Sequence, residues 1–390
     1  MTRPDPVDGP YAVHDHAHSG GPVREVPNGQ GRTCSYLVTG YDAARQALAD
    51  PRLSKDTQVF FAANPGGRDL HPALSRTMLA TDPPGHTRLR ALVTKAFTTG
   101  AVSRLRPRVQ QLTDDLLDRW PSGPGGEVDV VEALAVPLPV AVICELLGVP
   151  ESDRPDVRRW SAALFAAGAP ATTDAASHAV ASFMARLIAA KREAPGRSLL
   201  DGLIAARAGD DRFTEDELVS LACLLLVAGH ETTTNLIGNA FLALLLRPAA
   251  GSRLRENPDR IAGALDELLR FDSPVSTATF RHATEPLTLA GTDIPAGAPV
   301  LIALGAANRD PRRFADPGQL DLDRDAGGHL AFGHGIHRCL GAPLARAEAE
   351  IALRSVLARF PGCRLAVRPE QVRWRTTRLV RGPASLPVRV

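Results

Sequence analysis

Apolar positions recur with the spacing of helices along most of the chain from residue 86 onward. The helical pattern is clearest over five stretches that prolines and glycines separate, namely residues 103–119, 151–167, 175–192, 214–246 and 258–271. Two other stretches, residues 286–303 and 363–390, alternate short β-prone runs with glycine and proline turns. The pattern therefore predicts a mainly α-helical protein with a minor β portion.

The N-terminal part of the chain is less regular. Residues 1–34 are rich in proline, glycine and histidine, so we expect an irregular lead-in there. A short strand at Ser35–Gly40 and a short helix at Tyr41–Asp50, which Pro51 ends, follow the lead-in. We find no internal repeat and no interdomain linker, and we expect a single domain over residues 1–390.

The longest helical pattern contains a polar interruption. Leu218–Val227 and Leu236–Leu246 are strongly apolar, but the sequence GHETTTN at 229–235 separates them. A membrane-spanning helix needs about 20 uninterrupted apolar residues, so we expect a buried helix of a soluble protein, which begins with a capping box of Thr214 and Glu217. An acid and three threonines inside a buried helix need hydrogen-bond partners, and such a polar cluster indicates a functional site.

Composition and charge exclude several classes of protein. The chain has 390 residues, of which 44% are hydrophobic and 23% charged, and a formal net charge of only +2. This balance offers no electrostatic case for nucleic-acid binding. Five widely spaced cysteines without a CxxC pair argue against a disulfide framework and favour the reducing cytoplasm. The N-terminal sequence MTRPDPVDGPY lacks an apolar segment, so we expect neither a signal peptide nor a membrane anchor.

The sequence HLAFGHGIHRCLGAPLAR, residues 329–346, gathers potential metal ligands before a predicted helix. Zinc is one interpretation, because His334, His337 and Cys339 are suitable donors. However, zinc sites usually contain spaced pairs of ligands, and no second pair lies nearby. The HExxH motif also fails at HETTT, since Thr234 replaces the second histidine.

A metal could bind HDHAHS in the lead-in, which has His14, His16 and His18, but a polar loop is the simpler interpretation.

Haem iron held by a thiolate is the other interpretation of this stretch. Cys339 precedes Gly341 and Pro343, and proline favours the first turn of a helix. The dipole and unpaired N–H groups of a helix N-terminus stabilise a thiolate. Glycines at 333, 335 and 341 would let the backbone approach a flat macrocycle.

Three motifs resemble those of the cytochrome P-450 haem-thiolate monooxygenases. FGHGIHRCLG at 332–341 matches the family's cysteine-loop signature F-G-x-G-x-x-x-C-x-G, with Arg338 at its usual basic position. AGHET at 228–232 is similar to the motif of the family's central helix, and ELLR at 267–270 to its ExxR motif. The motifs occur in the family's order, and the resemblance covers essentially the whole chain. It implies a single large fold of the soluble bacterial class, with the long central helix over the haem.

The resemblance assigns haem contacts and a structural ion pair. Cys339 matches the axial ligand of the iron of haem b. The cations that match partners of the haem propionates are His86, Arg90, Arg281 and His337. The residues that match a buried structural ion pair and its third member are Glu267, Arg270 and Arg324.

The resemblance also assigns the oxygen site and the substrate pocket. Glu231 and Thr232 match the acid–alcohol pair that delivers protons, and Gly229 would leave a gap for oxygen. His230 occupies a variable position of the motif and receives no role. The residues expected to line the substrate pocket are Ala228, Gly229, Val275, Thr277 and Leu379.

The implied activity is insertion of one oxygen atom of O2 into a C–H bond or an alkene of a small hydrophobic substrate. The motifs are similar to those of members that act on macrolides and other polyketides, so we expect a secondary metabolite, as in antibiotic biosynthesis. The chain has no GxGxxG motif and no ferredoxin cysteine set. Electrons from NAD(P)H would therefore arrive through a separate ferredoxin and ferredoxin reductase. We expect a monomer with no nucleic-acid or membrane partner.

Three alternative functions remain open at this point. One is a haem-thiolate enzyme that uses peroxide directly or couples two substrate positions oxidatively. The others are a zinc hydrolase and a helical binding protein without catalysis.

Overall fold

The computed structural model describes residues 19–27, 34–58, 60, 69–96, 99–121, 123, 125–165, 170–206, 211–375, 377 and 379–390. The chain groups into two compact units. The first unit contains Met1–Ser54, Gln110–Val136 and Thr232–Val390, and the second contains Lys55–Val109 and Pro137–Glu231. Every described strand belongs to the first unit. The single domain over residues 1–390 stays a prediction, and His14, His16 and His18 lie outside the described residues.

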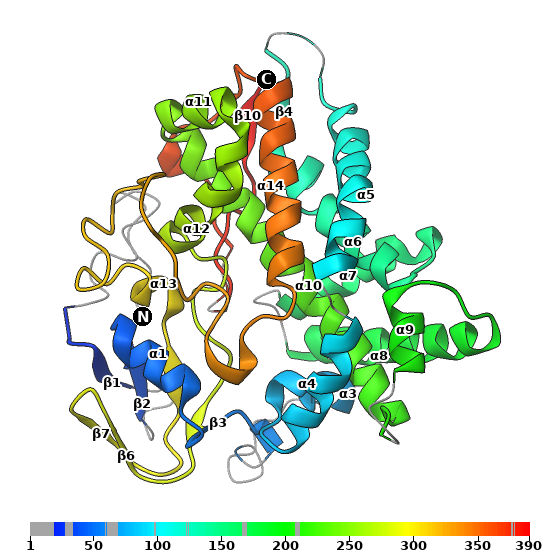
Figure 1. Cartoon of the computed structure of the whole chain (residues 1–390), viewed down its shortest axis with the longest axis vertical. Helices are drawn as coiled ribbons and strands as arrows, with labels where there is room; N and C mark the ends of the chain where they lie inside the picture. The colour runs from blue at the N-terminus through cyan, green and yellow to red at the C-terminus, as the bar shows by residue number, and fades with distance from the viewer. Residues whose placement is uncertain are drawn as a thin grey trace. The chain divides into compact units, whose positions relative to one another are not determined.

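A three-stranded sheet forms one part of the first unit. Its central strand β2 (Cys34–Val38) pairs antiparallel with β1 (Val23–Pro27) and parallel with β8 (Val300–Ile302). The sheet packs on helix α1 (Tyr41–Ala49), whose buried face includes Leu48 (Figure 1). The expected irregular lead-in is therefore wrong over β1, where buried and exposed positions alternate and the backbone pairs with β2.

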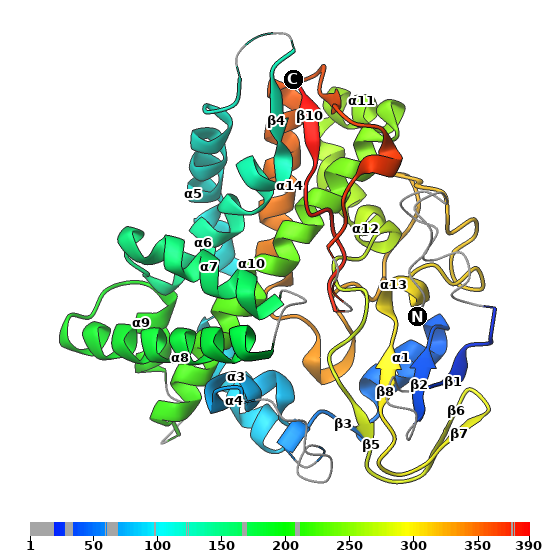
Figure 2. The same ribbon diagram turned by 180° about the vertical axis from the view of Figure 1, so that it is seen from behind.

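The remaining strands are short, and of these β6, β7, β9 and β10 lie in the predicted β portions, whereas β3, β4 and β5 lie outside them. One antiparallel sheet contains β4 (Glu127–Asp129), β10 (Pro387–Arg389) and β9 (Arg364–Leu365), with β10 in the middle (Figure 2). Two further antiparallel pairs join β3 (Leu53–Ser54) to β5 (His282–Ala283) and β6 (Leu287–Leu289) to β7 (Thr292–Ile294). The β portions predicted over residues 286–303 and 363–390 are confirmed.

Helices of the first unit gather around the one that follows the cysteine loop. This helix, α14 (Ala342–Arg359), has Gly341 as its N-cap and Pro343 in its first turn. It packs against two helices, α11 (Pro248–Glu256) and α12 (Ile261–Phe271). The shorter elements of this unit are α13 (Leu304–Ala307), η4 (Val131–Ala135), η6 (Pro258–Arg260), η7 (Gly335–His337) and η8 (Pro369–Gln371).

All regular elements among the described residues of the second unit are helices. Its helices are α3 (Pro72–Ser75), α4 (Gly85–Ala96), α6 (Pro137–Leu147), α7 (Arg154–Phe165), α8 (Pro170–Glu193) and α9 (Leu199–Ala205), with η3 (Met78–Ala80) and η5 (Glu151–Asp153). Helix α5 (Thr99–Leu117) begins in this unit and ends in the first. Helices α7 and α8 pack together, and a capping box of Ser198 and Asp201 begins α9. The helices predicted over residues 151–167 and 175–192 are confirmed.

The longest helix, α10 (Glu215–Leu245), runs unbroken through the polar sequence GHETTTN. The predicted capping box forms at its start: the Thr214 N–H donates to Glu217 Oε2 at 2.9 Å, and the Glu217 N–H donates to Thr214 Oγ1 at 3.3 Å. Residues up to Glu231 belong to the second unit and residues from Thr232 to the first. None of the helices in the described part of the chain is long and apolar enough to cross a membrane.

A buried ion triad organises the irregular part of the first unit. The Glu267 carboxylate, 1% exposed, accepts from Arg270 Nε at 2.6 Å and from Arg324 Nε at 3.3 Å. It also accepts from the Asp321 N–H at 3.0 Å. Arg270 donates its remaining hydrogen bonds to three backbone carbonyls, those of Asn308, Pro317 and Gln319. The triad therefore neutralises a buried charge and holds the chain between residues 308 and 324, as the ExxR resemblance implies.

We predict that Arg270→Leu lowers the free energy of unfolding by about 3–5 kcal/mol, because it leaves the Glu267 carboxylate buried with a weaker set of partners. Chemical denaturation followed by far-ultraviolet circular dichroism measures this loss. Arg389→Leu is the matched control: Arg389 forms an ion pair with Glu127 in which both side chains are about half exposed, and its loss should cost less than about 1 kcal/mol. Equal losses in the two variants would contradict the role of the triad.

Candidate active site

The cysteine loop of the first unit is shaped by glycines and held against the end of α1. Gly333 and Gly335 have φ angles of +72° and +73°, a conformation that side chains other than glycine rarely adopt. A Cβ on Gly335 would lie 2.8 Å from the Leu48 carbonyl oxygen, so only glycine fits at this contact. The Cys339 N–H donates to the Phe332 carbonyl at 2.9 Å and closes the loop.

The environment of Cys339 differs from that of the other central cysteines. Burial raises the pKa of the Cys144 and Cys223 thiols to about 12, so both are neutral thiols of the core. Cys339 is exposed and forms no disulfide. It lies two residues before the N-cap Gly341, hence just ahead of α14 and not within its first turn. Cys34 is exposed too, but it lies in strand β2, so Cys339 is the exposed cysteine that lies in a glycine-shaped loop.

Arg281 reaches the same end of α1 as the cysteine loop. Its buried guanidinium donates to the carbonyls of Leu48 and Leu53, both at 3.2 Å. These bonds orient the guanidinium without neutralising its charge. His337 ends the short helix η7 within the loop, and η7 contacts α1. The first unit thus brings together Arg281, the loop with Cys339 and His337, and the end of α1.

A second group of cations lies in the second unit. His86 and Lys55 are 2% and 3% exposed. Burial lowers the pKa of His86, and the nearby charges of Arg90 and Lys55 lower it further, whereas Asp82 acts in the opposite direction. The two positive charges of Lys55 and Arg90, with the buried His86 imidazole beside them, form a suitable site for an anionic group. The sequence predicted His86 and Arg90 but missed Lys55, because a single lysine before α4 carries no motif.

The polar centre of α10 is buried on one side and accessible on the other. Glu231 is 5% exposed, whereas Ala228, in the middle of the helix, is exposed. A Cβ on Gly229 would lie 2.9 Å from Ile143 Cδ1 of α6. The expectation that Gly229 leaves a gap for oxygen is therefore wrong, because the space of the missing side chain is filled by Ile143.

His230 is the residue of this motif that sequence reasoning left without a role. Its ring is 2% exposed and its Nδ1 lies 2.8 Å from the Leu226 carbonyl oxygen. Its Nε2 lies 3.9 Å from Glu231 Oε1. The structure thus gives Glu231 an ionisable neighbour in the same unit.

The predicted pocket residues of the first unit lie close together. Val275 pairs with Val380 in an isolated β-bridge. The N–H groups of Ser276 and Thr277 donate to the Leu379 carbonyl at 2.9 and 3.4 Å. Val275, Thr277 and Leu379 are all half-buried, as is Thr232 of α10. The predicted pocket residues Ala228 and Gly229 belong to the second unit.

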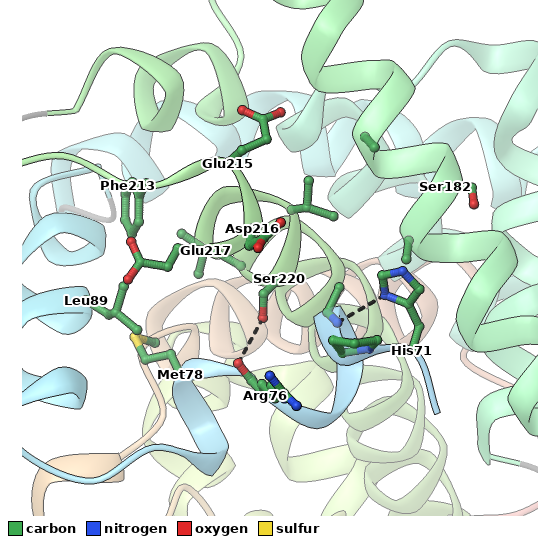
Figure 3. A pocket seen from close by; sticks show the side chains of 16 residues that line it. His71, Arg76, Met78, Leu89, Ser182, Phe213, Glu215, Asp216, Glu217 and Ser220 are labelled. Atoms are coloured by element: carbon green, nitrogen blue, oxygen red, sulfur yellow. Dashed lines mark hydrogen bonds between the residues drawn. The ribbon is translucent and has the colours of Figure 1, made fainter. Parts of the chain in front are cut away.

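A cavity of about 650 Å³ opens within the second unit (Figure 3). Its apolar wall includes Met78, Leu89 and Phe213, and the first turn of α10 adds acidic side chains. The Ser220 hydroxyl donates to the Arg76 carbonyl at 3.3 Å along one side. The cavity has the size and the mixed lining of a small-molecule site.

The comparisons with known proteins agree with this site. Residues 172–377 match the family model of cytochrome P-450. The chain is 47% identical to cytochrome P-450 107B1 of Saccharopolyspora erythraea, over 94% of this chain and 93% of the relative. It is 45% identical to the cytochrome P-450 monooxygenase PikC of Streptomyces venezuelae, over 97% and 91% of the two chains. The solved structure of the monooxygenase TamI with bound tirandamycin C matches with a TM-score of 0.89 and 48% identity, over 97% of each chain.

Together with the cysteine loop, the central helix and the ion triad, these matches show that the chain belongs to the cytochrome P-450 family. It is a haem monooxygenase whose similar proteins include hydroxylases and epoxidases of secondary metabolites. The mainly helical fold with a minor β portion is confirmed. Among the described residues, no group of three or more His, Cys, Asp or Glu side chains is placed to hold a metal ion, so the zinc hydrolase has no site in this part of the chain.

The residues present fit the haem that the family implies. Cys339 offers an exposed thiol on a loop shaped by glycines. Arg281 of the first unit offers a buried positive charge suited to a carboxylate. Taken by themselves, Lys55 and Arg90 of the second unit offer positive charge of the same kind.

We predict that Cys339→Ala abolishes the red-shifted Soret band of the reduced carbon monoxide complex together with all turnover, because the variant lacks the thiolate. Visible absorption spectroscopy measures the band. Cys223→Ala is the matched control and should keep the spectrum, because burial holds that thiol neutral. A band that persists in Cys339→Ala would show that another residue is the ligand.

We predict that Lys55→Leu and Arg281→Leu each increase the rate of haem loss to apomyoglobin at least about tenfold, which corresponds to one charge-assisted contact. Lys191→Leu provides the control, because Lys191 is paired with Asp201 at 3.1 Å and belongs to no predicted haem contact. If both variants lost haem as slowly as the wild type, Lys55 and Arg281 would not be haem contacts.

Proposed function

We propose that this monooxygenase hydroxylates or epoxidises a small hydrophobic secondary metabolite of the macrolide or polyketide type. The observation that carries the proposal is the accessible apolar surface at Ala228, near the middle of α10 and three residues, almost one helical turn, before Glu231. An apolar surface beside an acid–alcohol pair is where a hydrophobic substrate and oxygen have to meet. A relative that is 38% identical, named as the polyketide biosynthesis cytochrome P-450 PksS of Bacillus subtilis, supports a polyketide substrate.

Each functional residue has a defined task in this proposal. Cys339 would hold the haem iron as a thiolate, and the four predicted propionate partners together with Lys55 would bind its carboxylates. The haem supplies activation of O2. The Glu231 carboxylate takes up a proton and passes it on, and the Thr232 hydroxyl directs that proton toward oxygen. The reaction consumes substrate, O2, two electrons and two protons, and yields oxidised substrate and water.

The electrons are proposed to come from NAD(P)H through a separate ferredoxin and ferredoxin reductase. The absence of a dinucleotide motif from the sequence supports separate partners. A monomer in the reducing cytoplasm is the proposed state, and five cysteines that form no disulfide are in keeping with it.

A spectral titration of the holoenzyme tests the substrate class. We expect macrolactones and linear polyketides to shift the haem iron to high spin, and fatty acids and small aromatic compounds to have less effect. Turnover of the best compound under isotopically labelled O2 should place one labelled atom in the product. A coupled or dehydrogenated product without label would favour the oxidative coupling alternative, and turnover with hydrogen peroxide as fast as with NAD(P)H would favour the peroxygenase.

We predict that Thr232→Ala keeps haem binding and oxygen consumption but lowers the oxidised product formed per NAD(P)H. Without the hydroxyl, protons arrive in the wrong position and reduced oxygen leaves as hydrogen peroxide, so peroxide per NAD(P)H rises, about tenfold or more. Product and peroxide are quantified with a substrate that has no hydroxyl near the reacting carbon. Thr234 is a buried threonine of the same helix. Thr234→Ala is the control, and it should form as much oxidised product per NAD(P)H as the wild type. Unchanged coupling in Thr232→Ala would exclude the residue from proton delivery.

A further inference from the structure

A buried histidine stands next to the buried acid of α10. His230 and Glu231 are 2% and 5% exposed, and both belong to the second unit. The distance between His230 Nε2 and Glu231 Oε1 is 3.9 Å. Little water screens two such side chains from each other, so a charge on one acts strongly on the other.

The hydrogen bond at the other ring nitrogen decides which atom titrates. His230 Nδ1 lies 2.8 Å from the Leu226 carbonyl oxygen. A carbonyl oxygen can only accept, so Nδ1 carries a proton whether the ring is neutral or charged. Nε2 is therefore the atom that gains and loses a proton, and it is the atom that faces Glu231.

The ionisable side chains of the neighbouring helix are either neutral or bound to other residues. Helix α6 packs against α10 at Gly229, and its ionisable side chains are Cys144 and Glu145. Burial raises the pKa of Cys144 to about 12, so this thiol is neutral. Glu145 is bound to Arg108 at 2.6 Å and to Arg154 at 3.6 Å, and these arginines lower its pKa.

We propose that His230 is a positioning residue that orients the Glu231 carboxyl group and returns a proton to it after each delivery. The inference rests on the proposed function, in which Glu231 supplies protons. In the transfer, the Nε2–H bond of His230 breaks and an O–H bond forms at Glu231 Oε1. The ring is left neutral with its proton on Nδ1, and it regains a proton from solvent water, the source of both protons that the reaction consumes. Since 3.9 Å exceeds a hydrogen-bond distance, transfer requires a side-chain rotation that brings the two atoms to about 3 Å.

Titration of His230 tests the pair without any turnover. The ring nitrogens are followed by NMR in the diamagnetic reduced carbon monoxide complex, with histidine labelled by ¹⁵N. Glu231→Gln should lower the pKa of His230 by about 1–3 units, because it removes a carboxylate that favours the charged ring. Asp266 lies 3.2 Å from the Nε2 atom of another histidine, His329, and provides a matched control: Asp266→Asn should leave the His230 titration unchanged. An unchanged His230 titration in Glu231→Gln would overturn the proposal.

The pH dependence of turnover tests the proton transfer itself. His230→Gln keeps a side chain that can donate to Leu226 but cannot titrate, so turnover of the best compound should fall at least about tenfold. The ionisation that His230 contributes to the wild-type pH profile should also disappear. The double variant with Glu231→Gln should be as slow as Glu231→Gln alone, because His230 acts through Glu231. An unchanged pH profile, or additive losses, would show that the histidine only packs the helix.

The two experiments separate this inference from the proposed function. Thr232→Ala could form as much product per NAD(P)H as the wild type while the His230 titration still responded to Glu231→Gln. The proposed role of Thr232 would then be wrong, and the interaction between His230 and Glu231 would be supported. The titration uses only Glu231→Gln, so the pair stays testable even when a His230 variant does not fold.

Discussion

The Glu267 carboxylate has to be neutralised inside the core of the first unit, and its partners determine the path of a long irregular segment. Arg270 and Arg324 bind it from two different parts of the chain, 54 residues apart. Arg270 also binds the carbonyls at 308, 317 and 319, where almost no regular hydrogen-bond ladder exists. Because this segment leads directly into the cysteine loop, a buried charge far from the reacting atoms decides where Cys339 can be placed.

A single backbone carbonyl plays a similar part at the other side of that loop. The Leu48 oxygen is approached by Gly335 and accepts a hydrogen bond from Arg281. The Leu48 oxygen therefore contacts both Arg281, a predicted haem partner, and the loop that contains Cys339, the predicted iron ligand. Polar contacts of this kind fix position more strictly than apolar packing, since an unmatched buried group is costly.

Local sequence patterns predicted much of the fold, but they did not predict features that depend on contacts between residues far apart in the chain. The long helices and the capping box of Thr214 and Glu217 follow from residues three or four apart. Strand β1 was missed because its five residues become a strand only by pairing with β2. Lys55 was missed for a related reason: only folding places it near His86.

In the candidate site, too, motifs predicted some residues, and other roles depend on contacts that form only in the folded protein. Motifs identified Cys339, Glu231 and the residues of the ion triad because their types and order are specific. The role given to Gly229 was wrong in one respect, since a sequence does not show that Ile143 fills the space beside it. His230 received no role because its significance lies in the tautomer that the Leu226 carbonyl imposes, which is a property of the folded helix.

The burial of Lys55 gives the protein a chemical reporter. The chain contains only three lysines, Lys55, Lys95 and Lys191, and 42 arginines, which amine reagents leave untouched. Lys55 is 3% exposed, so an acylating reagent can reach its amine only when the surrounding cation cluster opens. Mass spectrometry of the labelled lysine would therefore record how often this part of the second unit opens, at a single residue and without an introduced probe.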